Sequence, residues 1–93
     1  MKTNHYKIIE FAGKVDMTRK PESGKARFLT LRMRGDERDE TYDFVVFEDH
    51  LFKPIDELKK NEEIKVTADL SAKWNKEIKQ TTLQLILTGI VKL

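Results

Sequence analysis

The fold is decided by residues 26–47, which read ARFLTLRMR-GDERD-ETYDFVVF. The first nine residues alternate with a period of two, which is typical of a β-strand with one buried face. One face carries Leu29, Leu31 and Met33, and the other carries Phe28, Thr30, Arg32 and Arg34. The polar run 35–39 predicts a turn, so the strands on either side of it are expected to form an antiparallel hairpin.

The second strand of this hairpin, residues 41–47, is apolar on both faces. Such a strand is either covered on both sides or offers an apolar surface to a ligand. Phe44 and Phe47 differ by three positions and therefore have opposite parity. The pattern leaves open which of the two lines the core and which faces a groove.

Three further strands are expected outside the hairpin. Residues 6–15 and 63–70 alternate in the same way, and residues 78–93 are rich in β-forming residues. Gly13 and Gly89 predict a bend or bulge in the strands that contain them. Two basic connections, residues 16–25 and 71–77, are predicted to be loops.

A short helix is expected between residues 47 and 63. Pro54 suits its first turn, and Ile55 and Leu58 fall on one side. Lys59 and Lys60 would lie at its end, where the helix dipole favours cations. Asn61 is expected to take a left-handed conformation as the cap.

Three strands, a helix and two strands make up the order of the OB-fold, a five-stranded Greek-key barrel. The predicted class is therefore all-β with one short helix, and the 93 residues form a single domain. In that fold, ligands lie across strands 2 and 3, between the loop joining strands 1 and 2 and the loop joining strands 4 and 5. Here those are the two basic loops.

The net charge of +2 hides a segregation along the chain. Residues 1–38 carry ten Lys or Arg against five Asp or Glu, residues 39–63 carry three against nine, and residues 64–93 carry five against two. A compact fold can bring the two basic stretches onto one face, although random surface decoration gives the same pattern. The absence of cysteine and of a long apolar run leads us to expect a cytoplasmic protein without disulfides or a membrane span.

Single-stranded nucleic acid is bound by cations that follow the phosphates and by flat side chains on which bases stack. The candidate stacking residues are Phe28, Phe44, Phe47 and Trp74. The candidate cations are Lys14, Lys25, Arg32, Arg34, Lys73 and Lys76, with further charge from Arg19, Lys20 and Lys79. Trp74 is expected in a polar loop, with a core position as its alternative. Phe28 has as alternatives covering the other opening of the barrel or a subunit contact, and solvated hairpin ends are the alternative for Arg32 and Arg34.

Catalysis has no support in the sequence. His5 and His50 are far apart and belong to no metal-spaced cluster. Ser23 has no nearby base, and there is no Gly-rich phosphate loop. We therefore expect no cofactor, no metal and no enzymatic activity.

In four stretches the chain resembles the bacterial and phage single-stranded DNA-binding proteins. These stretches are 11–15, 23–31, 42–47 followed by 58–60, and 70–74. The resemblance implies that bases stack on Phe44, Phe47 and Trp74 and that the protein forms homotetramers or homodimers. The chain departs from the family in three features. Phe44 and Phe47 are closely spaced, Asn61 replaces a usual glycine, and the Gly/Gln/Pro-rich tail with its acidic tip is lacking. It therefore resembles a minimal phage or mobile-element version, or a related primosomal accessory protein.

The leading expectation is sequence-independent binding of single-stranded DNA in replication or recombination, by a homodimer or homotetramer. RNA remains open as a ligand, because stacking and phosphate contacts do not read the 2′-OH. The alternative is an OB-type protein-interaction or assembly module whose aromatic faces are buried against another subunit.

Overall fold

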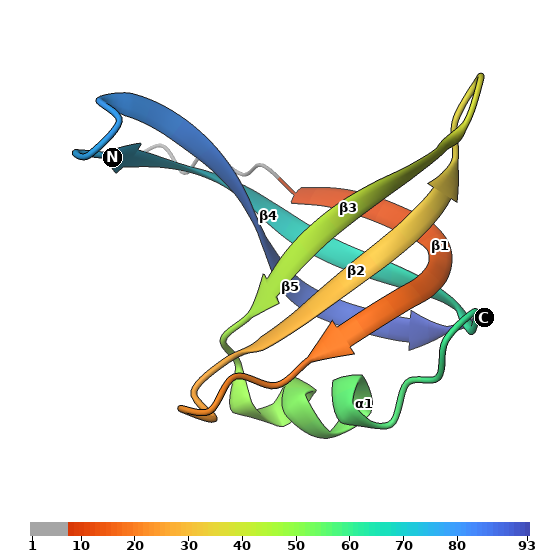
Figure 1. The fold of residues 1–93 in the computed structure, drawn as a ribbon. Coiled ribbons are helices and arrows are strands. Elements are labelled where there is room, and N and C mark those ends of the chain that lie inside the picture. Colours follow the sequence, from red (N-terminus) through yellow and green to blue (C-terminus); the bar gives the residue numbers. More distant parts are fainter. Residues whose placement is uncertain (1–7) are drawn as a thin grey trace, which may run out of the picture.

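A closed barrel of five strands forms the body of the protein in a computed structural model that describes residues 8–93 (Figure 1). The strands are β1 (Ile8–Arg19), β2 (Arg27–Arg34), β3 (Asp39–Val46), β4 (Glu63–Asn75) and β5 (Gln80–Lys92). Their order around the barrel is β1-β2-β3-β5-β4, and all neighbours are antiparallel except β3 and β5. A helical segment lies between β3 and β4. The predicted OB-fold is confirmed.

Strand β1 bends and changes partner halfway along its length. Its first half pairs with β4 up to Lys14, and its second half pairs with β2 from Lys14 onward. A Cβ on Gly13 would lie 2.8 Å from the carbonyl oxygen of Arg32, so only glycine permits this close approach of the two backbones. The predicted bend at Gly13 is confirmed.

The prediction that the first strand ends at Val15 is wrong. A register shift between Val15 and Met17 leaves Asp16 unpaired in a β-bulge, and β1 then continues to Arg19. Because the bulge changes the parity of the side chains, the simple alternation stops there. The loop between β1 and β2 is therefore short, residues 20–26.

The core is formed by the inward-facing residues of all five strands. Its fully buried members include Val15, Leu29, Leu31, Phe44, Val46, Ile64, Val66, Ala68 and Leu87. Phe11 packs against this cluster, with its ring edge-on to Phe44 at 5.0 Å between centroids. The predicted inward faces of β2 and β4 are thus confirmed.

One end of the barrel is covered by a 3-10 turn, η1 (Asp49–Leu51), and by α1 (Phe52–Asp56). Leu51, Ile55 and Leu58 bury their side chains there, as the sequence predicts for Ile55 and Leu58. Pro54 lies in the first turn of α1, as predicted, but the predicted end is wrong, because α1 ends three residues before Lys59. Asn61 has a φ of 71°, so its predicted left-handed conformation is confirmed.

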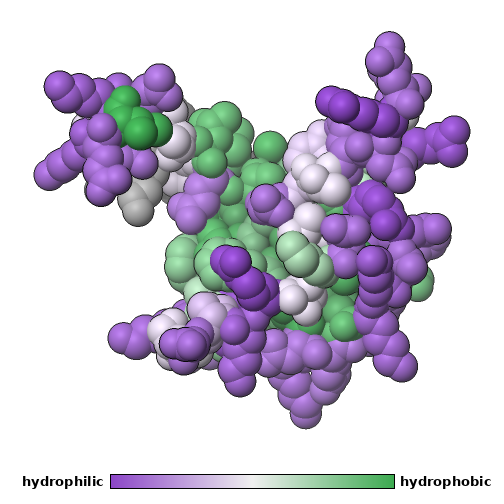
Figure 2. All heavy atoms as spheres, in the orientation of Figure 1, coloured by the Kyte–Doolittle hydropathy of each residue, from purple (hydrophilic) through white to green (hydrophobic). Residues whose placement is uncertain are grey.

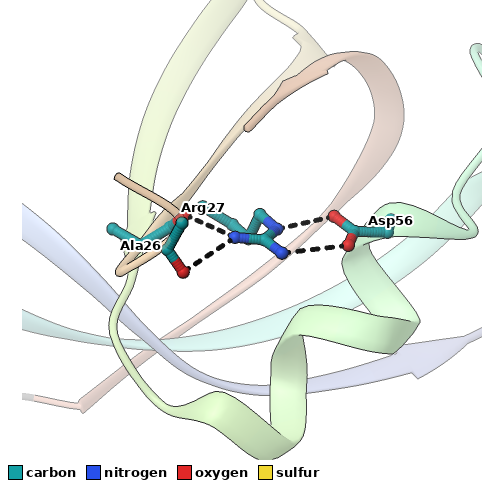
Figure 3. A network of polar contacts seen from close by, with 4 residues as sticks. Ala26, Arg27 and Asp56 are labelled. Carbon is teal, nitrogen blue, oxygen red and sulfur yellow. Dashed lines mark hydrogen bonds and ion pairs between the residues drawn. The ribbon is translucent and has the colours of Figure 1, made fainter. Parts of the chain in front are cut away.

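A buried arginine fixes α1 to the start of β2. Arg27 is only 6% exposed, and its guanidinium donates to both carboxylate oxygens of Asp56, at 2.8 and 3.2 Å (Figure 3). It also donates to the carbonyl oxygen of Ala26 at 2.9 Å and lies 4.4 Å from the ring centroid of Phe52. These contacts satisfy the buried charge and hold the loop between β1 and β2 at the closed end of the barrel.

Strands β4 and β5 extend beyond the barrel as a two-stranded arm (Figure 1). The predicted loop over residues 71–77 is wrong, because β4 runs to Asn75 and only residues 76–79 form the turn. Ladder pairing continues from Ser71 with Gln84 to Asn75 with Gln80. We refer to residues 70–85 as the β4–β5 arm. No helix within residues 8–93 has the length and apolar character needed to cross a membrane.

Candidate nucleic-acid interface

A row of four side chains crosses the barrel on the face opposite the core, and within it Val45 is only 5% exposed while Arg19 is exposed and Phe28 and Ile86 are partly exposed. Register pairs Arg19 with Phe28, Phe28 with Val45, and Val45 with Ile86. Residues paired in this way lie on the same face of a sheet, and this face is opposite to that of the core residues Leu29, Phe44 and Leu87. We call these four residues the outer row. It lies across strands 2 and 3, where the sequence predicts the ligand of an OB-fold.

Phe28 is half-buried in this row and carries a cation on its ring. The guanidinium carbon of Arg19 lies 4.7 Å from the centroid of Phe28, within the range of a cation–π contact. The predicted outward position of Phe28 is confirmed, while its role in stacking stays a prediction. A base that stacks here must either displace Arg19 or stack on the guanidinium plane.

A neighbouring row on the same face consists of Met17, Thr30 and Asp43. The hydroxyl of Thr30 donates to a carboxylate oxygen of Asp43 at 2.7 Å. A carboxylate at this place repels phosphate, so this part of the face suits bases and sugars better than the phosphodiester backbone. Met17 is exposed and adds apolar surface beside the outer row.

The structure decides between Phe44 and Phe47. Phe44 is 1% exposed and packs against Phe11 in the core, so it offers no face to a base. The prediction that Phe44 stacks on a ligand is therefore wrong. Phe47 follows β3 with the parity of Val45 and is 51% exposed, so it remains a candidate.

Trp74 lies in a strand and not in a loop. It pairs with Thr81 near the end of the β4–β5 arm, and its indole is 57% exposed. Its parity is that of Leu70 and the buried Ala68, so it lies on the face of the arm that continues the barrel interior. Leu83, 71% exposed, belongs to the same face through its pairing with Ala72. The arm extends past the barrel, so no core covers this face and the residues of β4 there need not alternate between apolar and polar. Without that alternation, the sequence predicts a loop.

A hollow opens between the two projecting parts of the molecule. Figure 2 shows it between the β4–β5 arm and the β2–β3 turn, with apolar side chains along its floor and mostly hydrophilic ones at the two tips.

Tyr42 packs against Phe11, with 5.5 Å between ring centroids, and its hydroxyl donates to Glu40 at 2.6 Å. This hydrogen bond, together with the negative charge of Glu40, raises the pKa of Tyr42.

The predicted cations fall into separate groups. Lys25 is exposed in the loop before β2, and Lys76 is exposed in the turn of the β4–β5 arm. Lys73 lies in β4, opposite Thr82, but its side chain is outside the described residues. Lys14, Arg32 and Arg34 lie elsewhere, around a cavity beside the bend of β1.

Arg32 is engaged within the protein. Its guanidinium lies 3.3 Å from Asp16 and 3.8 Å from Asp39 and donates to the side-chain oxygen of Asn61. It therefore links β2 to the β1 bulge and to the segment before β4. Arg32 and Arg34 lie on the same outward face of β2 as Phe28 but line a separate cavity, and their part in binding stays a prediction. At about 3.3 Å per residue, Arg34 lies roughly 20 Å along β2 from Phe28.

Sequence reasoning missed Met17, Tyr42 and Ile86 as members of these surfaces. Met17 could not be assigned because the bulge at Asp16 reverses parity after it. Ile86 joins the outer row only through the single parallel pair with Val45, which no local pattern encodes. Among residues 8–93, no group of three or more His, Asp or Glu side chains could hold a metal ion.

Comparison with known proteins gives a structural likeness but no match of sequence. No family model matches the chain, and no curated protein does. Among solved structures, the mitochondrial single-stranded DNA binding protein Rim1 from S. cerevisiae superposes with a TM-score of 0.78 at 18% identity, over 96% of both chains. The Plasmodium falciparum SSB in complex with ssDNA gives 0.71 at 16% identity, over 100% of this chain and 99% of that one. A small single-stranded DNA binding protein from Mycoplasma pneumoniae gives 0.67 at 10% identity, over 95% and 94%. The chain therefore shares the whole OB-fold of these proteins.

The different surroundings of the two phenylalanines predict different costs of substitution. Phe44→Leu should lower the free energy of unfolding by about 1–3 kcal/mol, because a smaller side chain leaves a cavity in the core. Phe47→Leu should change it by less than about 0.5 kcal/mol, as for an exposed residue. Urea unfolding followed by circular dichroism measures both. Equal costs for the two variants would contradict the assignment.

Proposed function

We propose that this protein binds single-stranded DNA without regard to sequence and without catalysing a reaction. The observation that carries the proposal is the outer row, which places Arg19, Phe28 and Ile86 at the surface beside the buried Val45, across the strands where OB-folds hold oligonucleotides. The likeness to solved single-stranded DNA-binding proteins over nearly the whole chain supports it.

The proposed interface binds bases by stacking on aromatic side chains and binds phosphates through lysines at its borders. Phe47 and Trp74 each expose more than half of their surface, and an aromatic that stacks a base contributes roughly 1–3 kcal/mol by alanine substitution. Lys20 and Lys25 stand in the loop before β2, and Lys76 and Lys79 in the arm turn, so phosphates have cationic partners on either side. Every base has a π-face, so binding of this kind does not depend on base identity.

We also infer that the protein assembles into a dimer or tetramer. Residues 8–11 of β1 pair with β4 on one side only, among the described strands, and their other backbone edge is open. An open edge is a template for a strand of another chain, and a two-fold pairing of β1 with its copy would close it. Ile8, which is exposed beside this edge, would then be covered.

The biological setting is proposed from the same chemistry. A protein of this kind protects single strands exposed during replication or recombination in the cytoplasm. A phage or mobile-element origin stays a prediction from the sequence. RNA as ligand is decided by competition between DNA and RNA oligomers of matched sequence.

A protein-interaction module is the second candidate. The large exposed fractions of Leu83, Ile8 and Val91 favour it, because exposed apolar surface marks contacts with other proteins. The two candidates differ in the part played by charge, since a phosphate backbone gives affinity that depends steeply on salt.

Binding is tested by titrating oligo(dT) and following the fluorescence of Trp74, the only tryptophan. We expect quenching, with log K falling linearly against log salt by roughly 0.7 for each phosphate neutralised. Phe47→Ala and Phe28→Ala should each weaken binding by about 1–3 kcal/mol. Val91→Ala, an exposed apolar residue away from the outer row, is the control and should leave the affinity unchanged. Absence of both quenching and salt dependence would reject DNA binding and favour the interaction module.

Assembly is tested by light scattering at micromolar concentration. We expect the mass of a dimer or tetramer, reduced toward the monomer by Ile8→Lys, because a charge would then replace an apolar side chain that the paired edges cover. Leu83→Lys, on the β4–β5 arm, should leave the mass unchanged. A monomer mass for the unmodified protein would refute the inference.

A further inference from the structure

A cavity of about 530 Å³ lies beside the bend of β1, away from the outer row. It opens where the first half of β1 turns away from β2, so its walls come from β1, from the end of β2 and the start of β3, from the start of β4, and from Leu93 after β5. Ala12 and Met33 give it an apolar part, and Met33 also packs against the core. Its volume is within the range of about 300–1,000 Å³ that is usual for small-molecule sites.

Two walls of the cavity each carry one cation beside one carboxylate. Lys14 stands opposite Glu63 in the β1–β4 register, and Arg34 stands opposite Asp39 in the β2–β3 register. Within residues 8–93, neither pair forms an ion pair, and neither Lys14 nor Arg34 has an ion-pair partner. Each wall therefore presents a cation that has no ion-pair partner within residues 8–93 beside a carboxylate, and of the two carboxylates Asp39 also lies 3.8 Å from Arg32.

The third cation of the cavity has a structural role. Arg32 is held by Asp16 and Asn61, with Asp39 at 3.8 Å. Its charge is therefore largely balanced by the carboxylates of Asp16 and Asp39, so it is not one of the cations that can take up a ligand. A ligand that fits must combine an anionic group for the free cations, a hydrogen-bond donor for the carboxylates, and a flat apolar part.

We propose that this cavity binds one nucleotide whose base carries an exocyclic amino group. Its phosphate would be held by Lys14 and Arg34, since charge-assisted hydrogen bonds to phosphate are among the stronger polar contacts. The amino group of cytosine is the donor that Asp and Glu side chains accept, whereas thymine presents only an acceptor oxygen at that position. The choice of a nucleotide rests on the proposed function, because the outer face of β2 leads from Phe28 to Arg34 and so from the outer row to the cavity.

The site is tested by nuclear magnetic resonance with deoxycytidine 5′-monophosphate as the probe and ¹⁵N-labelled protein. We expect saturable shifts of the amide signals of Ala12, Gly13 and Met33. Arg34→Ala should weaken binding about tenfold or more, the loss of one charge-assisted contact. Arg38→Ala, an exposed arginine in the adjacent turn, is the matched control and should leave the titration unchanged.

Three results would overturn the site. These are the absence of saturable shifts, equal binding by deoxythymidine 5′-monophosphate, and equal binding by inorganic phosphate alone. Quenching of Trp74 by oligo(dT) reports on the β4–β5 arm, so failure of the cavity and failure of strand binding are read from different signals.

The source of the nucleotide is distinguished by competition with an oligomer of deoxycytidine. If the oligomer displaces the mononucleotide and gives the same amide shifts, a nucleotide of the bound strand fills the cavity. If the mononucleotide stays bound beside the oligomer, the cavity takes a free nucleotide. Either result upholds the site.

Discussion

The close approach of β1 to β2 at Gly13 is the constraint on which the rest of the structure depends. A side chain at this position would meet the carbonyl oxygen of Arg32 at 2.8 Å and the side chain of Met33 at 3.0 Å. Because glycine stands there, β1 can leave β4, turn, and pair with β2, which closes the barrel. The same turn separates the first half of β1 from β2, which creates the open strand edge and the cavity. Closure, edge and cavity thus have one physical cause.

The second fixed point is Arg27 at the closed end of the barrel. By holding Asp56 and the Ala26 carbonyl, it ties α1 to the loop that borders the outer row. The basic side chains fall into two groups, those with an ion-pair partner in the protein and those without one. Arg27 and Arg32 are engaged within the protein, whereas Lys25, Lys76, Lys14 and Arg34 lack ion-pair partners among the described residues. This second group, unlike the first, can neutralise a ligand without first breaking an internal ion pair.

Much of the fold follows from period-two alternation. The inward positions of β2 and β4, the hairpin turn, the bend at Gly13 and the left-handed Asn61 are all readable from local sequence, because each reflects a local property of the backbone or of burial. The helix bounds are not, because Pro54 tolerates several positions in a helix start and only packing of Leu51 and Ile55 decides among them.

The candidate site is less predictable, since it depends on pairings between distant strands. Phe44 and Phe47 could not be separated without knowing where β3 ends. The sequence predicts a loop around Trp74 because this part of β4 lies beyond the barrel, where no core imposes an alternation of apolar and polar residues. Arg32 and Arg34 share a face with Phe28, yet the bend in β1 places them beside the cavity. Nothing in the local sequence shows that Asp16 and Asn61 both contact Arg32.

Photo-crosslinking of a halogenated oligo(dU) tests the central claim most directly, because it reports which side chains lie against the bases. Irradiation of the complex followed by mass spectrometry should place the cross-links on Phe28, Phe47 and Trp74. Cross-links confined to α1, or to the face that carries Ile8 and Val91, would contradict the outer row as the binding surface.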